Sequence, residues 1–293
     1  MQILSVSLPA PGALLAGRLL HPEGPGPWPA IVVTGSWTSV KEQMPMTWAR
    51  ALVSSGLAAL VFDFRGWGET GGAPRYTEAP ESKIEDLMAA FDWLAQQPGI
   101  DRDRIGGLAL CASAGYMAHA AARSDVPRAI ALVAPWLHDH DILLEVYGGA
   151  EGVKQLEVLG CDKADVVIEA ASASNAEALM YQVPYYTEPS RGLIAAWDNR
   201  FALRSWPLWL GFDGIAAAGA LKTPVCLIHS DAAAIPKGAR RFAERLGKRV
   251  TQHWLEGISQ FDFYDRPDVV AQGCQLVRAH FIRHGLLRGK EAM

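Results

Sequence analysis

The sequence predicts an α/β fold, with a mostly parallel, doubly wound sheet and an inserted, largely helical cap. Three observations support this. Short apolar runs alternate with amphipathic stretches over most of the chain, a strand near residue 104 leads through a tight turn directly into a helix, and the alternation stops at residues 138–222. We therefore expect a core of residues 1–137 and 223–293, with residues 138–222 inserted as the cap.

The elements of the core follow from local patterns. Alternating hydrophobicity predicts two opening strands, joined by a Pro/Gly turn, at residues 3–8 and 14–20. Apolar runs predict further strands, mostly of the buried parallel type, at residues 30–33, 57–62, 104–110, 128–135, 224–229 and 250–255. Helical spacing and helix-ending signals predict helices at residues 41–55, 81–97, 236–246 and 265–284, and one that starts just after residue 111.

Residues 138–222 are too long for a plain connection and too apolar for a disordered one. The segment is rich in aromatic residues, and its densest clusters contain Tyr185, Tyr186, Trp206 and Trp209. We expect these four side chains to close over the site, exclude water and bind an apolar or aromatic group. The alternative for each of them is that it only packs the cap onto the sheet.

Composition excludes several classes of function. The 293 residues carry a net charge of −4 without a long basic run, which argues against nucleic acid as a partner. No apolar run approaches the ~20 residues that span a bilayer, and the N-terminus lacks signal-peptide features, so we expect no membrane partner and a cytoplasmic protein. Four cysteines without CxxC spacing suggest neither zinc nor disulfides. We expect no cofactor or metal and a small-molecule acyl substrate, with a homodimer as one open oligomeric state.

The stretch from Arg104 to Tyr116 is the centre of the predicted fold. Cys111 stands at the apex of the turn, and small residues, Ala109 and Ser113, flank it two positions away on either side. This small-x-nucleophile-x-small pattern is typical of a nucleophile elbow, where strand and helix come too close for larger side chains. The helix N-terminus behind the apex favours an anion, so we expect Cys111 to lean towards thiolate.

Several stretches carry a resemblance to a known family. They are Gly35 to Gln43, Asp63 to Gly68, Pro98 to Gly106 and Phe261 to Asp265. On these motifs nearly the whole chain resembles the α/β-hydrolase superfamily, in its dienelactone-hydrolase-like branch. The resemblance implies an esterase, lactonase, thioesterase or acyltransferase; it is specific for the fold and weak for the substrate.

The resemblance also indicates the nucleophile. In the superfamily, a run like Arg104-Ile105-Gly106 is followed by the nucleophile about five residues after the glycine, which is Cys111 here. Ser113 stays open as an alternative, because Ala112-Ser113-Ala114-Gly115 looks like the serine elbow of lipase-like relatives. A third possibility is that Cys111 is merely a small buried hydrophobic residue.

The oxyanion hole implied by the resemblance consists of two backbone N–H groups. One belongs to Ala112, the residue after the nucleophile. The other comes from the loop after the strand at residues 30–33, from Ser36 or Trp37. The Trp37 side chain either walls the pocket or packs in the core.

The acid and the base are the incomplete part of the predicted site. Asp231 follows the strand at residues 224–229 and fits the position of a catalytic acid, with Asp262 as a nearby alternative; Asp63 looks like the structural aspartate of the family. In relatives with a catalytic triad, a histidine follows the last strand in a Gly-x-x-His pattern, and here Gln260 occupies that place. A glutamine amide cannot accept a proton at neutral pH, so the usual relay is incomplete.

Two remedies are conceivable. A thiol needs less help from a base than a hydroxyl does. Alternatively, a histidine reaches the site from elsewhere, and His138 at the entry to the cap is best placed, ahead of His140, His229 and His253. The leading expectation is an acyl-processing enzyme in which Cys111 attacks an ester, lactone or thioester; an acyltransferase or cyclase, and a non-catalytic small-molecule binder, are the alternatives.

Overall fold

The computed structural model describes residues 1–288. One sheet of eight strands organises the core, in the order β1-β2-β4-β3-β5-β6-β11-β12. β1 and β2 form an antiparallel hairpin, β2 is antiparallel to β4, and the remaining neighbours are parallel. The strands are β1 (Gln2–Ala10), β2 (Ala13–His21), β3 (Trp28–Thr34), β4 (Ala58–Phe62), β5 (Ile100–Leu110), β6 (Pro127–Val133), β11 (Val225–His229) and β12 (Val250–Trp254).

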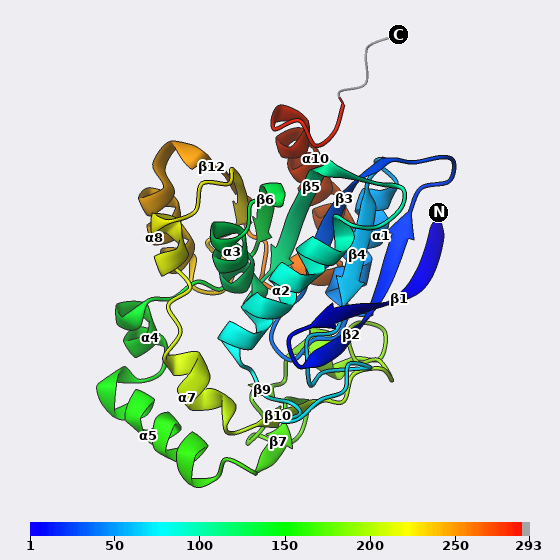
Figure 1. Ribbon diagram of the computed structural model, residues 1–293. Coiled ribbons are helices and arrows are strands. Elements are labelled where there is room, and N and C mark those ends of the chain that lie inside the picture. Colours follow the sequence, from blue (N-terminus) through cyan, green and yellow to red (C-terminus); the bar gives the residue numbers. More distant parts are fainter. Residues whose placement is uncertain (289–293) are drawn as a thin grey trace.

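Helices cover both faces of this sheet (Figure 1). One face carries α1 (Met44–Val53), α9 (Asp262–Asp265) and α10 (Pro267–Arg283), which contact one another, and the other carries α2 (Pro80–Leu94), α3 (Ser113–Arg123) and α8 (Pro236–Leu246). The central strands are buried on both sides: every residue of β4 and β11, and residues 105–110 of β5, are buried. These continuous apolar strands explain why the parallel, doubly wound fold was predictable.

The inserted segment (residues 138–222) lies between β6 and β11 in the chain. Its helices are grouped at one end of the sheet, together with short strand pairs (Figure 1). They are α4 (His140–Val146), α5 (Gly149–Asp162), α6 (Pro184–Thr187), α7 (Ser205–Leu210) and η1 (Ala216–Gly219), with β7 (Val167–Glu169) paired to β10 (Arg200–Ala202) and β8 (Ala171–Ser172) to β9 (Met180–Tyr181). The segment thus contains short strands that the sequence pattern did not indicate.

Predicted and observed elements differ mainly at their ends. The helix expected at residues 41–55 begins only at Met44, because residues 35–43 form a loop with its own hydrogen bonds. The helix expected at residues 265–284 is divided into α9 and α10, and Pro267 starts the second of them. Pro267 favours the first turn of a helix because it has no N–H to donate.

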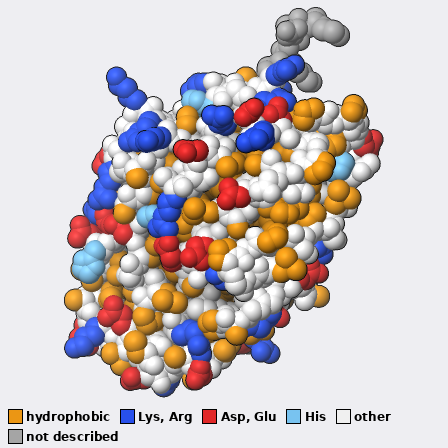
Figure 2. Space-filling view, viewed as in Figure 1, with side chains coloured by type: hydrophobic (Ala, Val, Ile, Leu, Met, Phe, Trp, Pro, Cys, Tyr) orange, Lys and Arg blue, Asp and Glu red, His pale blue; other side chains and the backbone are white. Residues whose placement is uncertain are grey.

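Two glycines in β5 allow close packing behind the elbow. A Cβ atom at Gly107 would lie 2.5 Å from the Met117 sulfur of α3, and one at Gly106 would lie 2.7 Å from the Ala129 carbonyl oxygen. Larger residues would therefore push α3 and β6 away from β5. On the face shown in Figure 2, side chains of both charges occur among apolar ones. No helix in residues 1–288 is long and apolar enough to cross a membrane.

Candidate active site

The turn between β5 and α3 has the geometry of an elbow. Cys111 adopts a φ of 56°, in the left-handed region that residues other than glycine rarely occupy. Neighbouring backbone holds this conformation: the Cys111 N–H donates to the Val133 carbonyl at 3.1 Å, and its carbonyl accepts from the Trp136 N–H at 3.0 Å. Strain of this kind persists only where the surroundings enforce it, and it collects at functional sites.

Cys111 opens into a cavity of about 480 Å³. The lining is mostly aromatic and aliphatic, and it comes from the elbow, from residues 36–37, from the inserted segment and from the region after β11 and β12. The lining residues are Ser36, Trp37, Cys111, Ala112, Trp136, Tyr147, Leu179, Met180, Tyr181, Val183, Tyr186, Trp206, Trp209, Ala234, Gln260, Phe261 and Tyr264. A cavity of this size and character suits a small apolar ligand.

The groups around the Cys111 sulfur are neutral hydrogen-bonding groups. They are the side chains of Tyr264, Ser36 and Gln260 and the backbone N–H of Ala112, and each of them favours the thiolate. Burial acts against them and is the larger effect, so the pKa of the Cys111 thiol is raised. The expectation that Cys111 leans towards thiolate is therefore corrected, because burial outweighs the donors at the helix N-terminus.

Gln260 lies beside Cys111 and lines the cavity. Its Oε1 accepts from the Ala234 N–H at 3.1 Å, and its Nε2 donates to the Ala134 carbonyl at 2.9 Å. Nε2 also lies 3.3 Å from the Tyr264 hydroxyl, to which it can donate. The amide thus connects the ends of β6 and β11 to α9, and it offers no site that accepts a proton at neutral pH.

Tyr264 is a member of the site that the sequence reasoning missed. Its hydroxyl contacts both Cys111 and Gln260, and burial raises its pKa well above the ordinary value. The phenol therefore keeps its proton at neutral pH and can act as a donor. The available signal was its spacing, because residues four apart in a helical turn share a face, and Tyr264 follows Gln260 by four.

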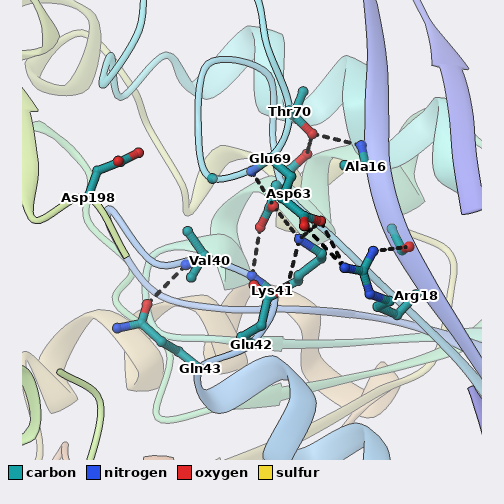
Figure 3. Close-up of polar contacts among 12 residues, drawn as sticks. Ala16, Arg18, Val40, Lys41, Glu42, Gln43, Asp63, Glu69, Thr70 and Asp198 are labelled. Carbon is teal, nitrogen blue, oxygen red and sulfur yellow. Dashed lines mark hydrogen bonds and ion pairs between the residues drawn. The ribbon is translucent and has the colours of Figure 1, made fainter. Parts of the chain in front are cut away.

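The second wall of the predicted oxyanion hole is the oxyanion loop (residues 35–43). Ser36 and Trp37 line the cavity together with Ala112, and within residues 1–288 the backbone N–H of Trp37 has no hydrogen-bond acceptor. Figure 3 shows how the core holds the end of this loop: the Lys41 N–H donates to Asp63 Oδ1 at 2.8 Å, and Lys41 Nζ lies 2.6 Å from Asp63 Oδ2. Lys41 Nζ also pairs with Glu42 at 2.9 Å and Glu69 at 2.7 Å. Asp63 therefore has a structural place in the core.

Ser113, the alternative nucleophile, is buried and absent from the cavity lining. Its hydroxyl accepts from Thr34 Oγ1 and donates to the Leu110 carbonyl, both at 3.0 Å. Its small size allows α3 to start directly behind the apex. The structure thus places Cys111, and not Ser113, at the cavity.

The structure does not bring the predicted acid and base to the cavity. The side chain of Asp231 is 69% exposed and pairs with Arg240 at 2.7 Å. His138 is buried against Trp209, with ring centroids 4.7 Å apart, and its Nε2 has no hydrogen-bond partner within residues 1–288. Burial lowers the pKa of His138. Neither residue lines the cavity, because the Asp231 side chain faces solvent and the Trp209 ring packs edge-on against the imidazole.

The other candidates also lie outside the cavity lining. His229 is fully buried at the end of β11 and stacks on Trp254 with ring centroids 5.4 Å apart. His140 is exposed, and His253 is partly buried in β12. Asp262 accepts from Ser259, from the N–H at 2.8 Å and from the hydroxyl at 2.7 Å, which is a local structural contact.

Three of the four predicted aromatic residues reach the cavity: Tyr186, Trp206 and Trp209. Tyr185 does not, because its ring packs against Tyr264 and over Gly192, where an added Cβ would lie 2.3 Å from it. Trp37 meets Trp209 edge-on at 4.5 Å between ring centroids, so it belongs to the aromatic wall. Within residues 1–288, no three His, Cys, Asp or Glu side chains gather as a metal site requires.

Comparison with known proteins identifies the family of this chain. The model of the X-Pro dipeptidyl-peptidase (S15) family matches residues 11–202. The uncharacterised protein YcjY of Escherichia coli is 28% identical over 86% of this chain and 87% of its own length. The thiohydrolase aneE of Aspergillus aculeatus is 41% identical over 32% of this chain, and the polyketide transferase claH of Penicillium crustosum is 34% identical over 37%. These two alignments span only 29% and 37% of the relatives' own lengths.

Solved structures show the same fold. The hypothetical protein PA2218 of Pseudomonas aeruginosa superposes with a TM-score of 0.82 at 22% identity, over 97% of this chain and 94% of that one. The α/β-hydrolase GrgF of a Penicillium species superposes with a TM-score of 0.77 at 17% identity, over 97% and 99%. The predicted α/β-hydrolase fold is confirmed.

Proposed function

This chain belongs to the X-Pro dipeptidyl-peptidase (S15) family, and from that premise we propose that it processes acyl groups through covalent attachment to Cys111. The family and the named relatives make it a hydrolase or a related acyltransferase. The observation that carries the finer proposal is the elbow: Cys111 stands at the strained apex, opens into an apolar cavity and has the Ala112 N–H beside its sulfur.

The neutral surroundings of Cys111 favour a thioester as the acyl donor. In the exchange, the bond from the Cys111 sulfur to the acyl carbon forms, the bond from that carbon to the leaving sulfur breaks, and the thiol proton moves to the leaving sulfur. The attacking and the leaving group are both thiols, so the proton passes between groups of the same kind and no strong base is needed. An oxygen ester or a peptide releases a much more basic group, which a positioned general acid must protonate.

The developing negative charge falls on the acyl oxygen. The Ala112 N–H and an N–H of Ser36 or Trp37 would stabilise it, and Gln260 would stand where related enzymes carry a histidine. Tyr264, which retains its proton, can donate to the sulfur as it becomes negative. The aromatic wall of Trp37, Trp206 and Trp209 would accommodate a small apolar or aromatic acyl group.

The second half of the reaction favours transfer over hydrolysis. Water needs a base to become a good nucleophile, and Gln260 and Tyr264 cannot serve as that base. A thiol or an amine is a better nucleophile without one. We therefore place an acyltransferase or cyclase ahead of a simple hydrolase.

A non-catalytic small-molecule binder is the second candidate. The raised pKa of the Cys111 thiol favours it, because most of the thiol is protonated at neutral pH and less reactive. In that case the cavity would hold an apolar ligand without a covalent step.

Intact mass spectrometry after incubation with an aromatic acyl thioester of N-acetylcysteamine separates these functions. The exposed Cys161 is first changed to Ala so that it cannot react. We expect one acyl addition in this background, the same addition in Ser113→Ala, and none in Cys111→Ala. An adduct that persists in Cys111→Ala contradicts the proposed nucleophile. Binding of the thioester without any adduct or turnover supports the binder.

A further inference from the structure

The inserted segment contacts the oxyanion loop through three hydrogen bonds that involve three different loop residues. The Ser36 hydroxyl bonds to the Tyr186 hydroxyl. The indole N–H of Trp197 donates to the Thr38 carbonyl at 2.8 Å. The amide Nε2 of Gln43 donates to the Gly192 carbonyl at 2.7 Å. All three partners lie within residues 186–197, while the loop residues span almost the whole oxyanion loop.

The oxyanion loop needs this support because its own conformation is unusual. Thr38 adopts a φ of 58°, in the left-handed region, although it is a β-branched residue. Its side-chain hydroxyl is buried and has no hydrogen-bond partner within residues 1–288. The backbone at Thr38 is therefore held by its surroundings, and the Trp197 indole is the group that binds its carbonyl.

The core holds only the two ends of the loop. β3 ends at Thr34, and at the other end Lys41 is bound to Asp63 (Figure 3). The bonds inside the loop, from the Ser39 hydroxyl to the Ser36 carbonyl and from the Val40 N–H to Gln43 Oε1, are local. Between its ends, and apart from the contact of the Ser36 side chain with Cys111, the hydrogen bonds from the loop to the rest of residues 1–288 come from the inserted segment.

The residues of the inserted segment that make these bonds are closely packed. Trp197 is buried and lies against Tyr186, with ring centroids 5.1 Å apart. An added Cβ at Gly192 would lie 2.3 Å from the Tyr185 ring, so the Gly192 carbonyl reaches Gln43 only because the side chain is absent. Trp197 and Gly192 do not line the cavity.

We propose that Trp197 and Gly192, with Gln43, are positioning residues: they hold the oxyanion loop, and with it the second oxyanion donor, in the place that acyl transfer requires. The inserted segment would then set the geometry of the reaction in addition to enclosing the substrate. Displacing residues 186–197 from the core would disassemble half of the oxyanion hole. The expected effect on the acylation rate of Cys111 rests on the proposed function, whereas the expected effect on hydrogen exchange in the oxyanion loop does not.

The decisive variant is Trp197→Phe, which keeps the aromatic packing and removes the N–H. Its matched control is Trp67→Phe, which removes an indole bond of the same type, from Nε1 to the Thr77 carbonyl at 3.3 Å, from a buried tryptophan that does not line the cavity. A second control, Asp198→Asn, breaks the exposed ion pair between Asp198 and Arg75, 3.0 Å long, which joins the inserted segment to the core elsewhere.

Hydrogen exchange followed by mass spectrometry measures the loop directly. We expect exchange in the peptide covering residues 35–43 to rise several-fold in Trp197→Phe and to stay at the wild-type level in both controls. Unchanged exchange in Trp197→Phe overturns the proposal, and so does an equal rise in Trp67→Phe, which would report general destabilisation. If Trp197→Phe does not fold, Gln43→Met removes the neighbouring bond and is measured in its place.

The acylation rate of Cys111 with the same thioester tests the catalytic consequence. A misplaced donor should lower the maximal rate about tenfold or more and leave the half-saturating thioester concentration nearly unchanged. A looser loop with a wild-type maximal rate would contradict the positioning role. If wild-type Cys111 is not acylated, the proposed function fails, and hydrogen exchange still decides whether Trp197 holds the loop.

Discussion

The elbow side of the cavity and the wall opposite it present different chemistry to Cys111. On the elbow side, the backbone of Ala112 and of the oxyanion loop supplies N–H groups, and the left-handed Cys111 stands between them. On the opposite wall, Gln260 and Tyr264 supply an amide and a phenol. The first side resembles a complete acyl-transfer site, while the second lacks the imidazole and carboxylate that would move a proton.

The oxyanion donors and the proton relay of such a site depend on different features of the chain. The proposed oxyanion donors are backbone N–H groups: the elbow supplies that of Ala112, and the oxyanion loop, as the inserted segment holds it, supplies the other. The proton relay needs particular side chains, and a single residue at position 260 alters it. A protein with this arrangement keeps the means to stabilise an acyl transition state but handles protons differently, which is why we favour thioester exchange.

The largest effect is expected where the elbow side is anchored. Lys41→Met should destabilise the protein by about 3–5 kcal/mol, because it removes the buried partner of Asp63. The matched control is Arg18→Met, which removes a partly exposed partner, 3.0 Å from Glu69, and should cost under about 1 kcal/mol. Urea unfolding measures both. Equal costs would show that the buried pair does not hold the oxyanion loop more firmly than a surface pair.

The buried end of β11, which lies outside the cavity lining, should respond to acid. Burial lowers the pKa of His229 to about 4, whereas its ordinary value is 6.5. Between pH 4 and pH 6.5, His229 binds a proton in the unfolded chain but not in the folded protein. The free energy of unfolding therefore falls as the pH drops from 6.5 to 4, and it does not depend on this group above pH 6.5. The loss should approach roughly 3 kcal/mol.

His229→Phe tests this titration by unfolding at pH 7 and at pH 4. The variant should lose less stability between the two pH values than the wild type does. His280, whose pKa burial also lowers to about 4, should leave part of the acid sensitivity in place. A variant with the wild-type pH dependence would show that His229 does not titrate in this range on unfolding.

Alkylation compares the reactivity of the elbow cysteine with that of a surface cysteine. Because burial raises the pKa of Cys111, we expect iodoacetamide to label it at pH 7.5 about tenfold or more slowly than the exposed Cys161. The labelling rate of Cys111 should still rise above pH 9. Peptide mapping over a pH series measures both sites. Faster labelling of Cys111 at pH 7.5 would mean that the helix N-terminus outweighs burial.

The smallest effect is expected when a histidine is introduced at position 260 in the opposite wall. Gln260→His should speed hydrolysis of the acylated Cys111 by a few-fold to about tenfold, because an imidazole can accept a proton from water. The increase in the hydrolysis rate should stay far below that of a complete Cys-His-Asp relay, because Asp231 is exposed and paired with Arg240 and so does not orient the introduced imidazole. Gln260→Met is the control without a base. Hydrolysis at the wild-type rate in the folded His variant would place position 260 too far from the acyl group.

Most of the fold could be predicted from the sequence, because local hydrophobic patterns indicate which residues are buried. Continuous apolar runs predicted the strands that the structure contains, and the helix at residues 236–246 matches α8 residue for residue. Boundaries failed where tertiary contacts decide them, as in the oxyanion loop, where Lys41 bonds to Asp63 instead of joining α1. The short strands of the inserted segment were missed because pairs of two or three residues carry no periodic signal.

The sequence by itself determined the elbow, the position of Cys111 at its apex and the presence of glutamine at position 260, because each follows from adjacent residues or fixed spacing. Only the tertiary structure decided which distant side chains surround the sulfur. It placed Tyr264 beside Cys111, kept Asp231 in solvent and His138 behind Trp209, and buried the thiol enough to raise its pKa. The physical reason is that burial and side-chain contact depend on segments far apart in the chain, which no local pattern records.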